Sequence, residues 1–223
     1  VMIYNIYSYW REYMDKITEE QVLKVLDTCY SKVIEGLPGS KNCYKLADEY
    51  INKYTSSEKA LQKFIDTQIA KCTTSGFITS LGGLITLPVA IPANLASVWY
   101  IQLKMIATIA VIGGHDPKDD EVQTLAYICL VGGSISQIFK QAGINFSNKL
   151  ALKSIEKIPG RILTKINQKI GFRFVTKFGT RGIVNLWKLV PVAGGVIGGG
   201  IDFIETRKIA KKAYKTFVLE EIE

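Results

Sequence analysis

The strongest constraint in this sequence is a long stretch without charge. Residues 72–103 contain no Asp, Glu, Lys or Arg. By length and hydropathy alone, such a stretch could cross a membrane as one helix. Two glycines, Gly82 and Gly83, and two prolines, Pro88 and Pro92, interrupt it. Because proline removes a helical hydrogen bond and clashes with the preceding turn, the sequence predicts a helical hairpin folded at the prolines instead of one straight span.

The uncharged stretch leads into a second predicted element, a long apolar helix over residues 94–112. Trp99 and Tyr100 lie near its middle. The glycines that follow are expected to end it. Asp116 is expected to cap the next helix, which is predicted over about residues 118–131, because acidic side chains are favourable near helix N-termini.

The N-terminal part of the chain carries clear helix-start signals. Thr18 and Gln21 have the spacing of a capping box, in which each side chain accepts from the other residue's backbone N–H, and Ile17 and Val22 fit the accompanying hydrophobic staple. The helix that they open is expected to end at the glycines and proline of residues 36–39.

Two more helices are predicted before the uncharged stretch. One covers residues 42–53, and Thr55 to Glu58 form a second capping box that opens the other. Leu61, Phe64, Ile65, Gln68 and Ile69 mark the inner side of the latter helix. Since no stretch alternates polar and apolar residues for long, we predict an all-α protein: a single multi-helix domain with apolar, Gly/Pro-rich helical hairpins.

A row of basic residues dominates the second half of the chain, which carries most of the net charge of +8. Lys or Arg recurs at every fourth position, and within the row only Glu156 opposes it. The members are Lys149, Lys153, Lys157, Arg161, Lys165, Lys169, Arg173, Lys177 and Arg181. Pro159-Gly160 and Gly171 are expected to break the row into shorter helices, each with a basic ridge beside apolar residues.

This basic ridge allows three interpretations. A solvated helix face is the simplest, but solvated faces normally mix both signs of charge. Attraction to an anionic lipid surface fits the single sign, since each nearby Lys or Arg contributes about 1 kcal/mol. Nucleic-acid binding is disfavoured because the ridge lacks the exposed aromatic side chains that would stack bases.

The C-terminal region combines a glycine cluster with the chain's best candidate polar site. Gly195 and Gly199 are spaced to let another helix approach closely. In the helix expected over residues 201–217, a charge on an apolar face needs a partner. The candidate polar site therefore consists of Asp202, Glu205, Thr206 and Arg207.

No catalytic motif is found in the sequence. There is no GxSxG, GxxxxGK or HExxH pattern, and the one histidine, His115, lies in a predicted turn. The four cysteines have irregular spacings typical of buried free thiols. The acidic residues at 116–121 are better explained as helix caps than as metal ligands. The sequence thus predicts no catalytic residue, no metal site and no cofactor.

Several motifs, taken together and in order, resemble the EcsC family of bacterial proteins. They are Gly82-Gly83, the segments 86–92 and 99–102, Gly114-His115-Asp116-Pro117, the segment 148–151, Ile158-Pro159-Gly160, and the segments 189–202 and 206–207. The resemblance covers about residues 58–217. It divides the chain into an aromatic-rich N-terminal helical region, residues 1–57, and an EcsC-like helical domain, residues 58–223. It implies a bacterial protein that faces the cytoplasm and acts near a membrane transport system of the ABC type.

The leading hypothesis from the sequence is a non-enzymatic, membrane-associated protein, peripheral to the inner face of the cell membrane. Its ridge would bind anionic lipid and its apolar Gly/Pro elbows would touch the bilayer. The alternative is a soluble interaction or lipid-binding module whose apolar segments form the core. A third alternative is an enzyme that uses the polar site around Asp202.

Overall fold

The computed structural model describes residues 17–73, 93–144, 158–179 and 197–221, and within them the fold is entirely helical. The helices are α2 (Glu19–Glu35), α3 (Cys43–Lys53), α4 (Ser57–Thr73), α6 (Ala93–Ile112), α7 (Asp120–Val131), α8 (Ile135–Gln141), α9 (Gly160–Gly179) and α11 (Ile197–Phe217). The pairing of Leu37 with Ser40 is an isolated bridge in a turn. The all-α prediction is confirmed.

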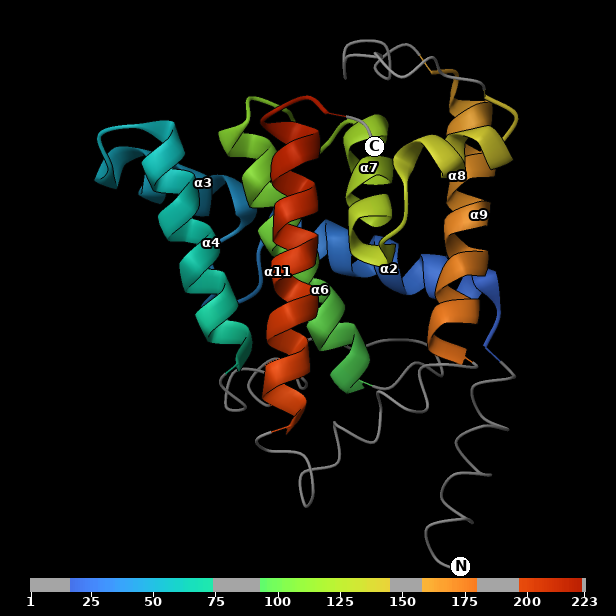
Figure 1. Cartoon of the computed structure of the whole chain (residues 1–223), viewed down its shortest axis with the longest axis horizontal. Coiled ribbons are helices and arrows are strands. Elements are labelled where there is room, and N and C mark those ends of the chain that lie inside the picture. The colour runs from blue at the N-terminus through green and yellow to red at the C-terminus, as the bar shows by residue number, and fades with distance from the viewer. Residues whose placement is uncertain (1–16, 74–92, 145–157, 180–196, 222–223) are drawn as a thin grey trace, which may run out of the picture.

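Helix α6 lies at the centre of the domain. It packs against α2, α3, α4, α7 and α11, while α9 packs against α2, α7 and α8 (Figure 1). Trp99, Tyr100, Leu103 and Ile106 of α6 are all buried in one hydrophobic core that also includes side chains of α2 and α3. The long apolar helix predicted from the sequence is therefore confirmed, and the N-terminal region shares its core with the rest of the described chain.

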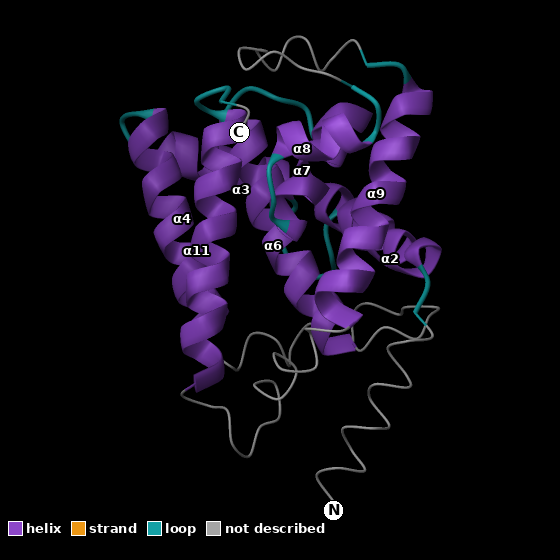
Figure 2. Ribbon diagram, turned by 45° about the vertical axis from the view of Figure 1, so that its right-hand side comes forward, coloured by secondary structure: helices purple, strands orange, loops and turns teal. Residues whose placement is uncertain are grey.

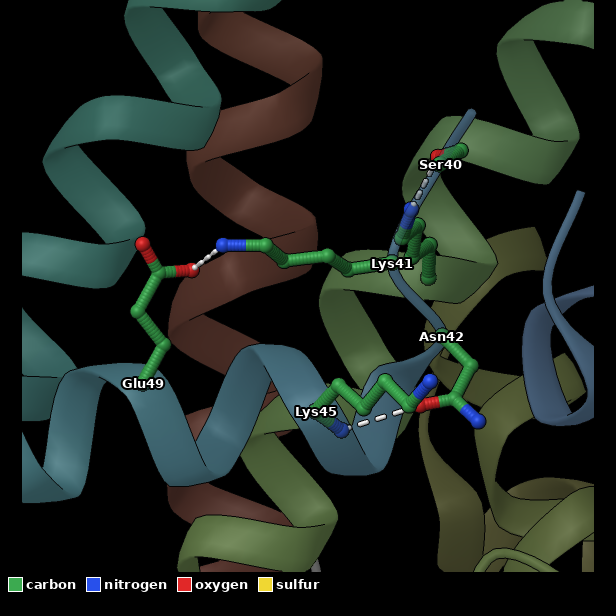
Figure 3. A network of polar contacts seen from close by, with 6 residues as sticks. Ser40, Lys41, Asn42, Lys45 and Glu49 are labelled. Atoms are coloured by element: carbon green, nitrogen blue, oxygen red, sulfur yellow. Dashed lines mark hydrogen bonds and ion pairs between the residues drawn. The ribbon is translucent and has the colours of Figure 1, made fainter. Parts of the chain in front are cut away.

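The helix starts follow the predicted local chemistry closely. Thr18 and Gln21 form the capping box, with N···O distances of 3.2 and 3.0 Å. Asn42 caps α3 through the backbone N–H of Lys45 at 2.9 Å (Figure 3). An ion pair of 2.8 Å between Lys41 and Glu49 then ties the approaching chain to the same helix (Figure 3). These interactions satisfy backbone donors that a helix start leaves free.

Three predicted details are wrong at the level of single residues. The cap of α4 is Ser56, whose Oγ accepts from the backbone N–H of Lys59 at 3.2 Å, and not Thr55. Helix α7 begins at Asp120 after Asp119, and Asp116 instead accepts from the backbone N–H of Lys118 in the preceding turn. The same Oδ1 of Asp116 also accepts from the hydroxyl of Tyr44 in α3.

Gly171 does not break α9, contrary to the prediction: the helix continues unbroken to Gly179. The reason for a glycine at this position is close packing against α2. A Cβ atom at position 171 would lie 3.2 Å from the backbone oxygen of Glu19 and 3.3 Å from a side-chain atom of Leu23. The glycine therefore lets α9 approach the start of α2, and helix–helix packing outweighs its low helix propensity.

One end of the domain gathers four helix ends. The C-terminal ends of α4 and α9 and the N-terminal ends of α6 and α11 all lie at the lower end of the domain, in both views (Figures 1 and 2).

The predicted elbow at Pro88 to Pro92 and the glycines Gly194 and Gly195 lie outside the described residues. Among the described helices, no single one has both the length and the hydropathy to cross a membrane. Helices α7 and α8 meet these criteria only as a pair, with a bend of 111° between them.

Candidate functional site

Helix α9 is amphipathic, and its inner face is fixed in the core. Leu163, Ile166, Ile170 and Phe174 are buried at helical spacing. The ring of Phe174 meets the ring of Trp99 edge-on, with 5.1 Å between the centroids. Because aromatic pairs in this geometry add to the energy of burial, the inner face holds α9 at a fixed rotation against α6.

The outer face of α9 carries the described part of the basic ridge. Arg161, Lys165 and Lys169 are exposed to solvent. Helix α9 contains no Asp or Glu, and within the described chain no carboxylate pairs with any of these three cations. No carboxylate of the described residues therefore compensates their charges. The side chains of Lys149, Lys153, Lys157, Lys177 and Arg181 lie outside the described residues.

Arg173 differs from the rest of the ridge. It is half-buried, and its Nη2 donates to the side-chain oxygen of Gln141 at 3.2 Å. Its guanidinium also lies against Gly133, where a Cβ atom would be 2.5 Å from Nη1. Lys212 of α11 donates to the backbone oxygen of the same Gly133. Two cations thus meet just beyond the C-terminus of α7, where positive charge is stabilising, and Arg173 has a structural role.

A single exposed aromatic residue lies among the free cations of α9. Phe172 is 53% exposed. It lies three residues after Lys169 and seven after Lys165, so helical periodicity places all three on one side of α9. The prediction that the ridge lacks exposed aromatic side chains is therefore wrong. The same periodicity, applied to the sequence, would have found Phe172.

The predicted polar site in α11 is divided between two sides of the helix. Thr206 is buried, and its Oγ1 accepts from the side-chain amide of Gln102 in α6 at 3.4 Å. Arg207 is exposed and lines a groove beside α4. Glu205 is half-buried, and the side chain of Asp202 lies outside the described residues. The structure therefore does not bring Thr206 and Arg207 into one site.

The turn before α7 contains acidic residues in a hydrogen-bonded arrangement. The Tyr44 hydroxyl donates to Oδ1 of Asp116 at 2.5 Å. This hydrogen bond, together with that from the Lys118 backbone, lowers the pKa of the Asp116 carboxyl below its usual value. His115 stands beside Phe217, with ring centroids 5.7 Å apart. Within the described residues, no three His, Cys, Asp or Glu side chains are grouped closely enough to hold a metal ion.

The described cysteines are buried thiols, as predicted. Cys29, Cys43 and Cys129 are free and fully buried. Burial raises the thiol pKa of Cys29 to about 12 and that of Cys43 and Cys129 to about 11. Because the thiolate is the reactive form, these side chains are poor nucleophiles and poor metal ligands at neutral pH.

Sequence reasoning missed two polar clusters at the edge of the core. Lys104, the one charged residue of α6, donates to Ser40 Oγ at 2.7 Å and lies 5.7 Å from the ring centroid of Tyr100. In the second cluster, the Tyr127 hydroxyl donates to Asp27 at 2.7 Å. A lone lysine in an apolar helix was the available signal for the first cluster, since such a charge needs partners. The first cluster connects α6 to the turn before α3, and the second connects α7 to α2.

The comparisons with known proteins point to one family. The model of the EcsC protein family matches residues 2–219, which include the N-terminal region that the sequence motifs had left aside. The uncharacterized protein YdbA of Bacillus subtilis (strain 168) is 27% identical over 211 residues, which cover 85% of this chain and 74% of YdbA. No solved structure matches the chain. The chain belongs to the EcsC protein family.

Proposed function

We propose that this protein is a non-enzymatic, membrane-associated helical protein that binds anionic lipid surfaces through the outer face of α9. The observation that carries the proposal is the composition of that face. Three exposed cations, Arg161, Lys165 and Lys169, lie on the same side of α9 as an exposed Phe172. A helix that lies on a membrane combines basic residues with a bulky apolar side chain in the same way.

The expected energy of attraction is sufficient for reversible binding. Each Lys or Arg near an anionic surface contributes about 1 kcal/mol, so the three exposed cations supply about 3 kcal/mol. Phe172 adds apolar area that would leave water at the interface, at about 25 cal/mol per Å². Because the inner face of α9 is held in the core, the attachment requires no unfolding of the helix.

The lower end of the domain gives further support. Residues 74–92, which include no charged residue, join the end of α4 to the start of α6, and both of these helix ends lie at the lower end of the domain (Figure 1). Phe172 lies seven residues from Gly179, the end of α9 on the same side, which corresponds to roughly 10 Å along the helix. A membrane that approached this end would therefore meet the exposed phenylalanine of α9. A position beside a membrane transport system belongs to the same proposal.

The burial of α6 favours a second candidate function, a soluble interaction or lipid-binding module. Trp99, Tyr100 and Leu103 are all at most 2% exposed, so this apolar helix is occupied by the protein's own core. In this alternative, the exposed face of α9 would contact another protein or remain in solvent. The two candidates differ in one measurable property, which is binding to the surface of anionic vesicles.

Vesicle sedimentation tests the proposal directly. The protein should sediment with vesicles that contain phosphatidylglycerol and remain in solution with purely phosphatidylcholine vesicles. Binding should fall as salt rises to about 1 M, where screening acts over ~3 Å. At every salt concentration, Phe172→Ala should bind these vesicles more weakly than the original protein, with the same salt dependence. Ile51→Ala, at another exposed apolar residue, is the matched control and should bind like the original protein. Equal binding to both vesicle types would contradict the proposal.

A further inference from the structure

A groove runs between α4 and α11, on a part of the surface that the α9 face does not reach. The two helices stand side by side in both views (Figures 1 and 2). The groove has a volume of about 750 Å³. Small-molecule sites in proteins usually measure about 300 to 1,000 Å³. The groove is therefore of the size of a small amphiphile.

The lining of the groove is apolar at its base. Ile69 and Ala210 are buried at the bottom, and Ile65 and Tyr214 are half-buried in the walls. Ile204 of α11 is 52% exposed and lies one turn before Arg207, toward the lower end of the domain. One more exposed apolar side chain therefore lies on the same side of α11 just beyond the groove.

The charges of the groove are unequal on its two walls. Arg207 and Lys211 line the α11 wall, both exposed, and within the described chain neither forms an ion pair. The one acidic residue of the lining is Asp66 on the α4 wall, which accepts from the side-chain amide of Gln62 at 3.0 Å and not from either cation. Two cations one turn apart thus remain available to a carboxylate.

We propose that this groove binds a single-chain anionic lipid, namely a long-chain fatty acid. Its hydrocarbon chain lies along Ile65 and Ile69, and its carboxylate meets Arg207 and Lys211. No residue of the groove belongs to the outer face of α9. The fatty-acid site and the vesicle-binding surface are therefore separate, and each can be lost without the other.

Isothermal titration calorimetry, in which laurate is titrated into the purified full chain, tests the site. Binding should saturate at one laurate per chain, and affinity should rise by up to about fourfold for each CH₂ added to the ligand. Dodecanol has the same chain length without the charge and should bind about tenfold more weakly. Absence of saturable binding, or equal affinity for laurate and dodecanol, would overturn the proposal.

Two sets of variants locate the site. The double variant Arg207→Glu/Lys211→Glu should weaken laurate binding about tenfold, whereas Lys208→Glu, an exposed lysine of the same helix outside the groove, should change it less than about twofold. Ala70→Trp places a large side chain at an exposed position of the lining and should abolish binding. Melting curves check that each variant is folded. Equal losses in Lys208→Glu and the double variant, or unchanged affinity in Ala70→Trp, would refute this location.

Discussion

Helices α6 and α9 have the same length, 20 residues, and opposite surroundings. Helix α6 has a single charged residue, Lys104, and is enclosed by five other helices. Helix α9 has five basic residues and no acidic one, and only one of its faces is buried. A helix that is apolar all round is covered by protein or lipid. An amphipathic helix buries its apolar face in the core and leaves its polar face on the surface of the domain.

The contrast shows that apolar sequence alone does not identify a membrane-binding element in this chain. The apolar helix α6 is used for the core, with Trp99 and Tyr100 fully enclosed. The free cations of α9, by contrast, contribute no contact that the described fold requires. Changes to the inner and outer faces of α9 should therefore affect different properties. Three predictions test α9 and a fourth tests a contact between α3 and the turn before α7, and they are ordered by expected size.

The largest effect is expected from Phe174→Ala, on the inner face of α9. The side chain is fully buried against Trp99, so its removal leaves a cavity and should lower the free energy of unfolding by about 3 to 5 kcal/mol. Phe172→Ala, two residues earlier on the outer face, is the matched control and should change it by less than about 0.5 kcal/mol. Urea denaturation followed by circular dichroism measures both. Similar losses in the two variants would mean that α9 has no distinct outer face.

The second prediction concerns the outer face. Neutralising Arg161, Lys165 and Lys169 together to Gln should weaken binding to anionic vesicles by about 3 kcal/mol, because each cation contributes about 1 kcal/mol near the surface. The unfolding free energy should stay within about 0.5 kcal/mol of the original protein. Lys59 and Lys63, exposed on α4, provide a control when both are changed to Gln. Unchanged vesicle binding in the triple variant would remove α9 from the mechanism.

The third prediction tests the contact between α9 and α2. Gly171→Leu should destabilise the protein by about 1 to 3 kcal/mol, since even a Cβ atom there would press on Glu19 and Leu23. Gly160→Ala, at the start of the same helix, meets no atom within 4 Å and should be neutral or slightly stabilising. Thermal melting of both variants measures the difference. A stable Gly171→Leu variant would show that α2 can move away from α9 at little cost.

The sequence predicted the features that depend on neighbouring residues. The capping box of Thr18 and Gln21 involves residues three positions apart, and Asn42 caps its helix in the same local way. The core positions of α4, including Phe64, follow from helical periodicity. These predictions succeeded because the physical cause and its effect lie within one helical turn.

Three of the failed predictions involve partners distant in the sequence. Asp116 looked like a helix cap, but its carboxylate accepts from Tyr44, which is 72 positions away. Gly171 looked like a helix break, but it serves a contact with α2. Arg173 looked like a member of the lipid-binding ridge, but it is held by Gln141 of α8. No local pattern contains this information, because it arises only when the helices pack.

The smallest effect is expected from Tyr44→Phe, which removes the hydroxyl that donates to Asp116. The pKa of Asp116 lies below the usual value of an aspartate carboxyl chiefly because of this hydrogen bond, so it should rise toward that usual value in the variant. A depressed pKa in the folded state stabilises the fold above the unfolded pKa, and this contribution is lost as pH falls through the folded pKa. Because Asp116 is exposed, the loss at neutral pH should be less than about 1 kcal/mol.

Carboxyl NMR titration of Asp116 measures this shift directly. The difference in stability between Tyr44→Phe and the original protein should be constant near neutral pH and should shrink below about pH 4, where the carboxyl becomes protonated in the unfolded chain. Tyr54→Phe removes another hydroxyl near the end of α3 and should leave the Asp116 titration unchanged. An Asp116 pKa that is the same with and without the Tyr44 hydroxyl would mean that the Lys118 backbone N–H alone holds the carboxylate, and that α3 and the turn before α7 are joined only by packing.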